Sequence, residues 1–460
     1  MSFTLHPHQL DTVDRVRQKM REGFKRILVV APTGSGKTVI AVYMLGTAQA
    51  KGNQCLFSVH RRELVHQSCE AFETVGIPYG VIASGFPGRA DARIQVGSIQ
   101  TLAKRSIPTP KLIVPDEAHH FASLSWSKFF SQFPDATIVG LTATPQRLDG
   151  KGLGKYFDVI VEGPSTRWLI DNGYLCPYRM FSPPGVSVQG IKTEMGDYAK
   201  VALAAAVDKP TITGDVIAHY KKHALGRRAV CFAVSVEHSK HVVAQFNAAG
   251  IPAAHCDGET NPGIRDGIVA DLKRGALLVV SNVDLFGEGF DLPAIEACIM
   301  LRPTKSLAMY LQQVGRALRT APGKVDAVLL DHAGNVKVHG LPDEPREWSL
   351  EGEDKAKARA KAEAGGGVRV CPRCFAAQLF ATQCRFCGEI FPARAREVEH
   401  VKGELEEINP GARVFDGPKT KRELTEAQLW AMAKSKGMKD PGLFVRKVLA
   451  NRLVKEALNG

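Results

Sequence analysis

The sequence lacks the features that mark a membrane protein, a secreted protein or a fibre. Its 460 residues include no run of about 18 apolar side chains, so we expect no membrane-spanning helix and no membrane partner. The first residues carry no basic segment followed by an apolar core, which argues against a secretory signal. Hydrophobic residues make up 44% and charged residues 23%, which excludes wholesale disorder, collagen and a coiled-coil rod. We therefore expect a globular protein of about two to four domains in a reducing compartment.

Acidic residues are too few to balance the basic ones. The chain has 60 Lys and Arg residues against 47 Asp and Glu residues, which gives a net charge of +13. Such an excess favours a polyanionic partner, for example nucleic acid. Many basic proteins have no such partner, so charge alone leaves the question open.

Cysteine is scarce except in one segment. Six of the ten cysteines are scattered, as is typical of small buried side chains. The other four form two Cys-x-x-Cys pairs, Cys371 with Cys374 and Cys384 with Cys387, separated by nine residues. Four thiolates at this spacing predict a tetrahedral, structural Zn²⁺ site. A redox pair is the alternative, although redox motifs belong to α/β units rather than to an isolated ribbon.

Short apolar runs alternate with helical patterns between residues 26 and 300, and a further apolar run follows at 327–330. Continuous Val, Ile and Leu runs are typical of parallel strands buried on both faces, and the alternation is typical of sheets covered by helices. We expect an α/β fold with two such domains in tandem, then a small cysteine-rich ribbon and a basic, helical tail. In chain order, the first domain, connection, second domain, linker, ribbon and tail are expected at 1–165, 166–210, 211–350, 351–368, 369–392 and 393–460.

A phosphate-binding loop is predicted at residues 31–38, Ala-Pro-Thr-Gly-Ser-Gly-Lys-Thr, which follow an apolar run and open a helical pattern. The glycines let backbone N–H groups point at phosphate oxygens, and the helix dipole favours the same anion. Lys37 would reach the β- and γ-phosphates of ATP, and the Thr38 hydroxyl would ligate Mg²⁺. A glycine-rich loop without a ligand is the less favoured interpretation. The residues expected to hold the nucleotide here are Thr33, Gly34, Ser35, Gly36, Lys37 and Thr38.

An acidic pair ends another apolar run, in the sequence Asp-Glu-Ala-His. We expect Asp116 to hold Mg²⁺ and Glu117 to polarise the water that attacks the γ-phosphate. An acidic pair at a strand end is often only a helix cap, so the assignment depends on the phosphate loop upstream.

In their order and spacing, these motifs resemble those of superfamily 2 helicases of the DEAH-box type, including the RadD-like and phage-encoded DNA helicases. The resemblance covers roughly residues 3–345 and implies two tandem RecA-like domains, which are parallel sheets flanked by helices. It implies that Gln9, in Leu-His-Pro-His-Gln, reads the adenine edge of ATP. It also implies that His119, Thr142 and Thr144 couple hydrolysis to strand binding.

The same resemblance assigns arginine fingers and nucleic-acid contacts. Gly289 and Asp291, in Gly-Glu-Gly-Phe-Asp, would bridge nucleotide and nucleic acid. Arg316 and Arg319 would be the fingers that neutralise charge on the γ-phosphate, with Gln312 beside them. The residues that the resemblance places against nucleic acid are Arg61, Arg62, Ser98, Gln100, Thr101, Asp257 and Gly258.

Together these features predict an ATP-dependent DNA helicase or translocase that requires ATP, Mg²⁺ and Zn²⁺. We expect it in the cytoplasm of a bacterium or of a phage host, in DNA repair, recombination or phage replication. Single-stranded or forked DNA is the expected partner, and RNA is the alternative because such a core contacts phosphates rather than bases. A protein partner is a further expectation, at the zinc ribbon or the basic tail. The sequence also leaves two more functions open, namely the motor subunit of a restriction system and a zinc-bearing nucleic-acid clamp with an inactive ATPase.

Overall fold

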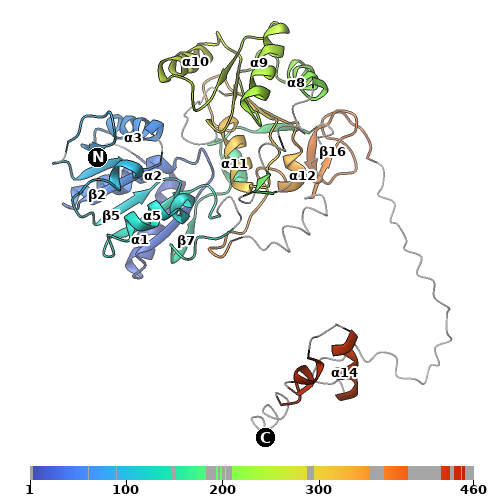
Figure 1. The fold of residues 1–460 in the computed structure, drawn as a ribbon. Helices are drawn as coiled ribbons and strands as arrows, with labels where there is room; N and C mark the ends of the chain where they lie inside the picture. Colours follow the sequence, from blue (N-terminus) through green and yellow to red (C-terminus); the bar gives the residue numbers. More distant parts are fainter. Residues whose placement is uncertain are drawn as a thin grey trace. The chain divides into compact units, whose positions relative to one another are not determined.

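The computed structural model resolves the chain into two compact units, residues 1–393 and residues 394–460 (Figure 1). The structure describes residues 4–60, 62–89, 91–146, 151–182, 193–194, 197–198, 203, 210–286, 295–352, 367–391, 426–435, 440–446 and 448–450.

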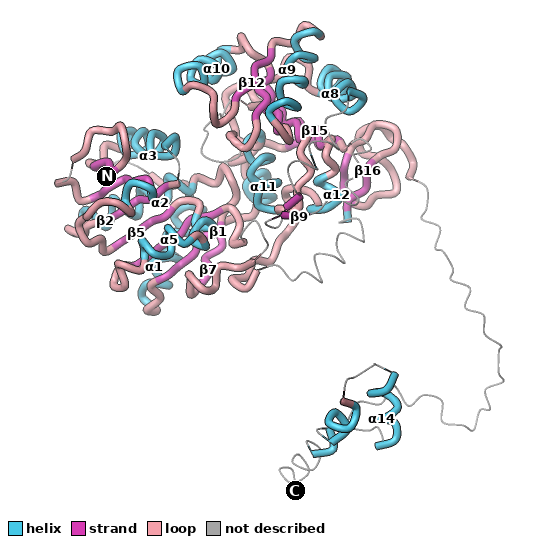
Figure 2. The backbone as a smooth tube through the Cα atoms, in the orientation of Figure 1, coloured by secondary structure: helices cyan, strands magenta, loops and turns pink. Residues whose placement is uncertain are grey.

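The first domain is a parallel sheet with helices packed against it (Figure 2). Its elements are α1 (Pro7–Arg21), β1 (Arg26–Val30), α2 (Lys37–Ala50), β2 (Cys55–Val59), α3 (Arg62–Thr74), β3 (Gly80–Ile82), β4 (Ile94–Ser98), α4 (Ile99–Leu102), β5 (Leu112–Pro115), the 3₁₀ helix η1 (Ala118–Ala122), α5 (Leu124–Phe130), β6 (Thr137–Thr142) and β7 (Val159–Glu162). The seven strands lie in the order β3-β4-β2-β5-β6-β1-β7, and all neighbours are parallel. Parallel neighbours require crossover connections, which the helices supply.

Each face of this sheet packs on its own set of helices. In β1, Ile27 and Val29 belong to the apolar cluster that includes side chains of α1, α2 and α3. Leu28 and Val30 belong to the cluster that includes side chains of α4, η1 and α5. Because successive strand residues point to opposite faces, both faces are apolar and the run in the sequence is uninterrupted.

The second domain repeats this architecture with six parallel strands. Its elements are α6 (Thr166–Asp171), β8 (Tyr178–Phe181), α8 (Pro210–His223), β11 (Ala229–Phe232), α9 (Val236–Ala248), β12 (Ala253–Cys256), α10 (Pro262–Arg274), β13 (Val279–Asn282), β14 (Ala297–Met300), α11 (Leu307–Ala317), β15 (Ala327–Asp331) and α12 (Asn335–His339). The strand order is β12-β13-β11-β14-β15-β8, with every neighbouring pair parallel. The fold class expected from the apolar runs is therefore confirmed.

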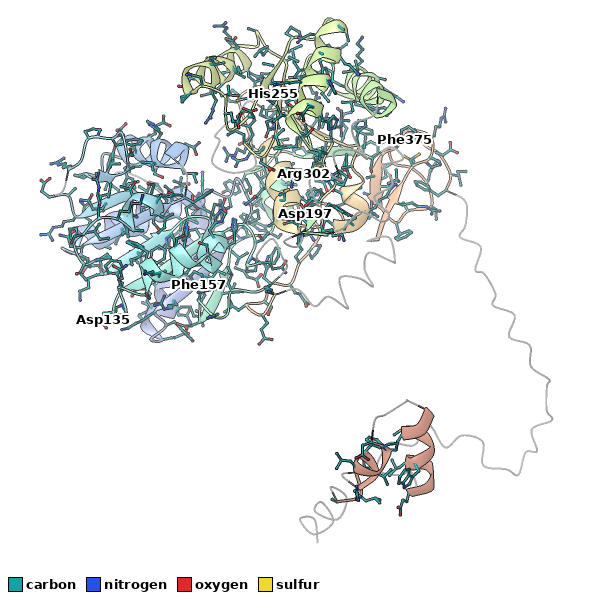
Figure 3. The ribbon with its side chains drawn as sticks, viewed as in Figure 1. Asp135, Phe157, Asp197, His255, Arg302 and Phe375 are labelled. Carbon is teal, nitrogen blue, oxygen red and sulfur yellow. The ribbon has the colours of Figure 1, made fainter. Side chains whose placement is uncertain are left out.

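The segment expected to connect the two domains contributes structure of its own. It contains α6, β8 and a hairpin of β9 (Thr193–Glu194) and β10 (Asp197–Tyr198). Asp197 accepts a hydrogen bond from the backbone N–H of Lys305 at 2.8 Å and lies 3.6 Å from the buried Arg302 (Figure 3). The hairpin therefore contacts the loop that leads into α11.

The cysteine-rich ribbon packs directly on the second domain. It consists of β16 (Val368–Val370) and β17 (Ala377–Leu379), which are antiparallel. The backbone N–H of Ser182 donates to the carbonyl of Phe375 at 2.8 Å, and Phe181 forms a bridge with Ala376. Two of the cysteines belong to the same apolar cluster as the buried side chains of α8. The ribbon therefore shares the core of the second domain.

The second unit contains α14 (Glu426–Ser435) and a further helical stretch at 441–446. Leu429, Ala433 and Val445 are buried within it. In the part of the chain that the structure describes, no helix combines the length and the apolar character needed to cross a membrane.

Candidate active site

The phosphate loop lies between the end of β1 and the first residue of α2. Gly34 and Gly36 have φ values of +88° and +84°, in the region that side chains with a Cβ rarely adopt. Lys37 donates hydrogen bonds from Nζ to the carbonyls of Ala31 at 3.0 Å and Pro32 at 3.1 Å. No described residue forms a hydrogen bond with the buried Ser35 hydroxyl. The loop thus offers the Lys37 ammonium group, the backbone N–H groups of a tight turn and the unpaired Ser35 hydroxyl. Together these groups fit a phosphate.

Charges around Lys37 come from both domains. Burial lowers the pKa of Lys37, whereas the nearby carboxylates of Glu117 and Asp116 raise it. Arg319 and Arg316 lie close enough to lower it further. The predicted acidic pair and the predicted arginines therefore lie near enough to Lys37 to interact with it electrostatically.

Gln9, in α1, forms a hydrogen bond with the phosphate loop. Its Nε2 donates to the carbonyl of Ser35 at 3.4 Å, and its Oε1 accepts from the backbone N–H of His6 at 3.0 Å. A Cβ at Gly36 would lie only 2.2 Å from this Nε2, so the contact requires glycine.

Two aromatic rings that the motifs did not indicate pack against His8, the residue before Gln9. Tyr174 packs edge-on against His8, with ring centroids 4.4 Å apart, and stacks on Trp168 at 5.8 Å. Trp168 is 40% exposed, so this group is open to solvent. Both rings belong to the expected connection, where no motif distinguishes them from its other aromatic residues.

The acidic pair, a buried Asp116 and a half-buried Glu117, is held in a tight turn. Burial and the neighbouring Glu117 raise the pKa of Asp116 to about 6, although Lys37 opposes this. Glu117 has a φ of +50°, which costs on the order of 1–3 kcal/mol for a residue with a side chain. The backbone N–H of Glu117 donates to Asp116 Oδ1 at 3.0 Å. A buried carboxylate of this kind, with the Thr38 hydroxyl, is an oxygen donor set that suits Mg²⁺.

The three residues expected to couple hydrolysis lie together. His119 Nδ1 is 3.3 Å from Glu117 Oε2 and 3.4 Å from Thr142 Oγ1. The Thr142 hydroxyl donates to the carbonyl of Thr144 at 2.7 Å, and the buried Thr144 hydroxyl has no hydrogen-bond partner among the described residues. The end of β6 is thereby linked to the acidic turn.

The predicted finger helix, α11, packs against the phosphate loop. A Cβ at Gly315 would lie 2.5 Å from Thr33 Cβ, and one at Gly34 would lie 3.5 Å from Arg319 Cγ. Gln312 and Arg316 are both buried. Burial lowers the pKa of Arg319 to about 10, so its guanidinium remains charged at neutral pH.

Lys324 is a site residue that the sequence argument missed. Its Nζ donates to the carbonyls of Ala317, Arg319 and Ile295, the last at 2.7 Å. Burial lowers the pKa of Lys324 to about 8. The carbonyls of Ala317 and Arg319 lie at the C-terminal end of α11, where carbonyls lack partners within the helix. The ammonium group of Lys324 therefore caps this end of the helix.

Comparisons with known proteins match both halves of the chain to helicase-related families. Residues 2–147 match the family described as "Type III restriction enzyme, res subunit", and residues 208–321 match the helicase conserved C-terminal domain. A 51.5 kDa protein of a Lactococcus phage is 36% identical over 382 residues, which cover 82% of this chain and 80% of the phage protein. The chain belongs to the superfamily 2 helicases.

Two further relatives extend the comparison. IRC3 of Saccharomyces cerevisiae, which carries the name of an ATP-dependent helicase, is 28% identical over 76% of this helicase and 54% of its own length. A fragment of an HsdR subunit of a type I restriction enzyme from Vibrio vulnificus has a similar fold, with a TM-score of 0.57 and 23% identity. That match covers 73% of this chain and 65% of the fragment. The chain therefore spans about half the length of IRC3 and just under two thirds of the HsdR fragment.

The nucleic-acid contacts expected in the first domain lie at the ends of neighbouring strands. The Ser98 hydroxyl donates to Thr101 Oγ1 at 3.0 Å, and Gln100 Nε2 donates to the carbonyl of His60 at 2.8 Å. Arg62 is the first residue of α3. Residue 61, an arginine, lies outside the described residues, as do Gly289 and Asp291.

In the second domain, Asp257 shapes a turn beside Gly258. Its Oδ1 accepts hydrogen bonds from the backbone N–H groups of Glu259 and Thr260, and its Oδ2 lies 3.1 Å from His255 Nε2. Although burial opposes the shift, hydrogen bonds from His255 and Thr260 lower the pKa of Asp257 to about 2. A permanently charged carboxylate repels phosphate, so Asp257 fits a role in holding this turn for its neighbours.

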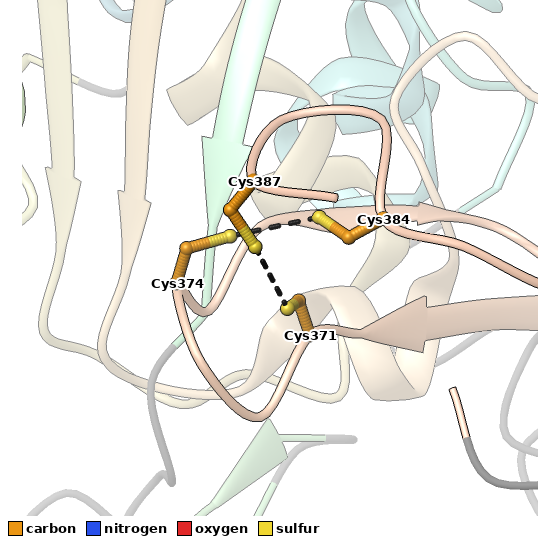
Figure 4. Close-up of side chains that lie close together, drawn as sticks. All are labelled: Cys371, Cys374, Cys384 and Cys387. Carbon is orange, nitrogen blue, oxygen red and sulfur yellow. Dashed lines mark hydrogen bonds between the residues drawn. The ribbon is translucent and has the colours of Figure 1, made fainter. Parts of the chain in front are cut away.

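The four paired cysteines of the helicase converge on one point (Figure 4). Their sulfur atoms all lie within 4.8 Å of one another, with 3.6 Å between Cys371 and Cys387 and between Cys374 and Cys384. Although partial burial opposes it, backbone N–H groups lower the pKa of Cys384 to about 7. Sulfurs at about 2.3 Å from a tetrahedral Zn²⁺ would lie at similar separations. The donor set therefore fits a closed zinc site.

Proposed function

We propose that this helicase hydrolyses ATP between its two domains and uses the resulting motion to translocate along or unwind DNA. The observation that supports this most strongly is the packing of α11 against the phosphate loop, with Gly315 facing Thr33. Two arginines of the second domain thereby lie near the lysine and carboxylates of the first.

The cycle follows from this division of charges. ATP would contact Lys37 on one domain and Arg316 and Arg319 on the other, so its binding stabilises the closed arrangement. Thr38 and Asp116 would hold Mg²⁺, whose charge would offset that of the phosphates, and Glu117 would orient the attacking water. Loss of the γ-phosphate removes the bridge between the domains, and a strand bound by both is moved as they separate.

The nucleotide base and the zinc site complete the proposal. Gln9 would read the adenine edge, and the exposed ring of Trp168 with the half-buried ring of Tyr174 would provide an apolar wall nearby. The ribbon would hold one structural Zn²⁺, so metal analysis of purified protein should find one equivalent. Its absence from Cys384→Ser protein, with the wild type fully loaded, would confirm the ligand.

ATPase measurements with and without single-stranded DNA test the motor. Wild type should be stimulated by DNA, whereas Lys37→Ala, Glu117→Gln and Arg319→Ala should each be reduced by about 10³-fold or more. Turnover close to wild type in all three variants would refute the site. Parallel assays with RNA of the same sequence decide between DNA and RNA as the stimulating strand.

A second candidate is the motor subunit of a restriction system. The family model matched by residues 2–147 and the HsdR-like fold both favour it. Such a motor depends on a sequence-recognition chain, so stimulation by any single-stranded DNA supports the helicase proposal. Stimulation only by duplex DNA in the presence of a second chain would support the restriction motor.

A further inference from the structure

The strand order of the first sheet fixes a row of side chains along one edge. β4, β2, β5 and β6 are neighbours in that order. Gln100 follows β4, His60 follows β2, His120 follows β5 and Thr142 ends β6. Because parallel strands all end at the same edge, these positions lie in a row that runs from the expected nucleic-acid contacts to the nucleotide site.

The contacts along the first half of this row are direct. Gln100 Nε2 donates to the backbone carbonyl of His60 at 2.8 Å. The His60 ring packs against the His120 ring, with centroids 4.3 Å apart and planes inclined by 44°. His120 follows the acidic pair in η1, so this contact joins the loop after β2 to the acidic turn.

The second half of the row ends on the proposed catalytic carboxylate. The His120 and His119 rings lie 4.2 Å apart. His119 Nδ1 is 3.3 Å from Glu117 Oε2 and 3.4 Å from Thr142 Oγ1. Contacts therefore run without a gap from the end of β4 to the carboxylate that would orient water.

We propose that His60 and His120 are positioning residues that transmit nucleic-acid binding to ATP hydrolysis. This inference rests on the proposed function. A nucleic-acid strand bound at the ends of β4 and β2 would hold the carbonyl of His60 in place. The contact between the His60 and His120 rings would then hold η1 in place. Glu117 has a left-handed backbone, so its turn is strained and its carboxylate is sensitive to small displacements of η1. Nucleic acid bound at one end of the row thereby favours the position of Glu117, at the other end, in which its carboxylate can orient the attacking water.

A purely structural role predicts a different outcome. His120 also packs near Trp126, with ring centroids 6.1 Å apart, so in a purely structural role its removal would act by disturbing the apolar cluster under η1. Such damage lowers stability and turnover in the presence and absence of DNA alike. Loss of DNA stimulation alone separates transmission from packing.

The test is a double-mutant cycle on the DNA stimulation of ATPase activity. The variants are His60→Ala, His120→Ala, the double variant and His120→Phe, which keeps a ring. His66→Ala is the matched control, because His66 contacts Phe86 at 4.4 Å in the same domain but outside the row. Each is measured for DNA-free turnover, turnover at saturating single-stranded DNA, DNA affinity by fluorescence anisotropy, and Tm.

We expect each alanine variant to lose about five-fold or more of the stimulation, with DNA-free turnover and DNA affinity near wild type. The double variant should lose no more than the worse single variant, and both His120→Phe and His66→Ala should keep the stimulation. Wild-type stimulation in both alanine variants, additive losses, or an equal loss with and without DNA would overturn the inference alone. A wild type that DNA does not stimulate would overturn the proposed function and the inference together.

Discussion

Gly315 offers the sharpest test of domain closure, because a single methyl group should block it. A Cβ at this position would lie 2.5 Å from Thr33 Cβ, about 1 Å closer than ordinary van der Waals contact. Overpacking of this kind costs about 1–3 kcal/mol. The cost falls only on the closed arrangement, since Thr33 and Gly315 belong to different domains. Gly315→Ala should therefore lower kcat by roughly 5- to 150-fold.

Folding should not suffer in the same variant. Alanine is a better helix former than glycine by up to about 1 kcal/mol, so α11 itself gains stability. Gly267→Ala in α10 is the matched control, because a Cβ there meets no described atom within 4 Å. The assay is steady-state ATPase activity at saturating DNA, beside Tm for each protein. A Gly315→Ala enzyme with the kcat of wild type would show that hydrolysis does not require α11 to approach the phosphate loop.

Three further predictions concern single groups. Lys324→Met should lower kcat and cost about 1–3 kcal/mol of unfolding free energy in denaturant titrations, because the carbonyls of Ala317 and Arg319 at the end of α11, and that of Ile295 before β14, lose their donor. Gln9→Ala should raise KM for ATP and narrow the preference for ATP over GTP, and an unchanged ATP:GTP ratio would contradict its role in reading adenine. ATPase activity should fall as the pH drops through about 6, where Asp116 takes up a proton, and excess Mg²⁺ should move the midpoint lower because it binds only the ionised carboxylate.

Those parts of the site that lie in contiguous segments could be predicted from the sequence. The conformation of the loop at 31–38 depends on its own glycines, and the position of the acidic pair at Asp116 depends on the buried strand directly before it. Both features can therefore be recognised within a short segment of sequence. The apolar runs predicted two parallel sheets because strands buried on both faces have no polar alternation.

Contacts that depend on strand order could not be predicted in the same way. His60 and His120 meet because β2 and β5 are neighbours, although some 60 residues of sequence separate them. The segment 166–210 has weak apolar patterning, so the strand at Tyr178–Phe181 and its place beside β15 were not apparent. Lys324 carries no motif, and its role follows only from three carbonyls that converge on it.

The position of the ribbon has a consequence for solubility. β8 is the last strand of the second sheet, and its far side is covered by the ribbon through Phe181 and Ser182. A bare outer strand presents unpaired backbone groups that can recruit another chain. If the four cysteines hold Zn²⁺ as proposed, removal of the metal and unfolding of the ribbon would leave the backbone groups of β8 unpaired on that side. On that proposal, loss of Zn²⁺ would favour aggregation through this edge strand, whether or not the nucleotide site is intact.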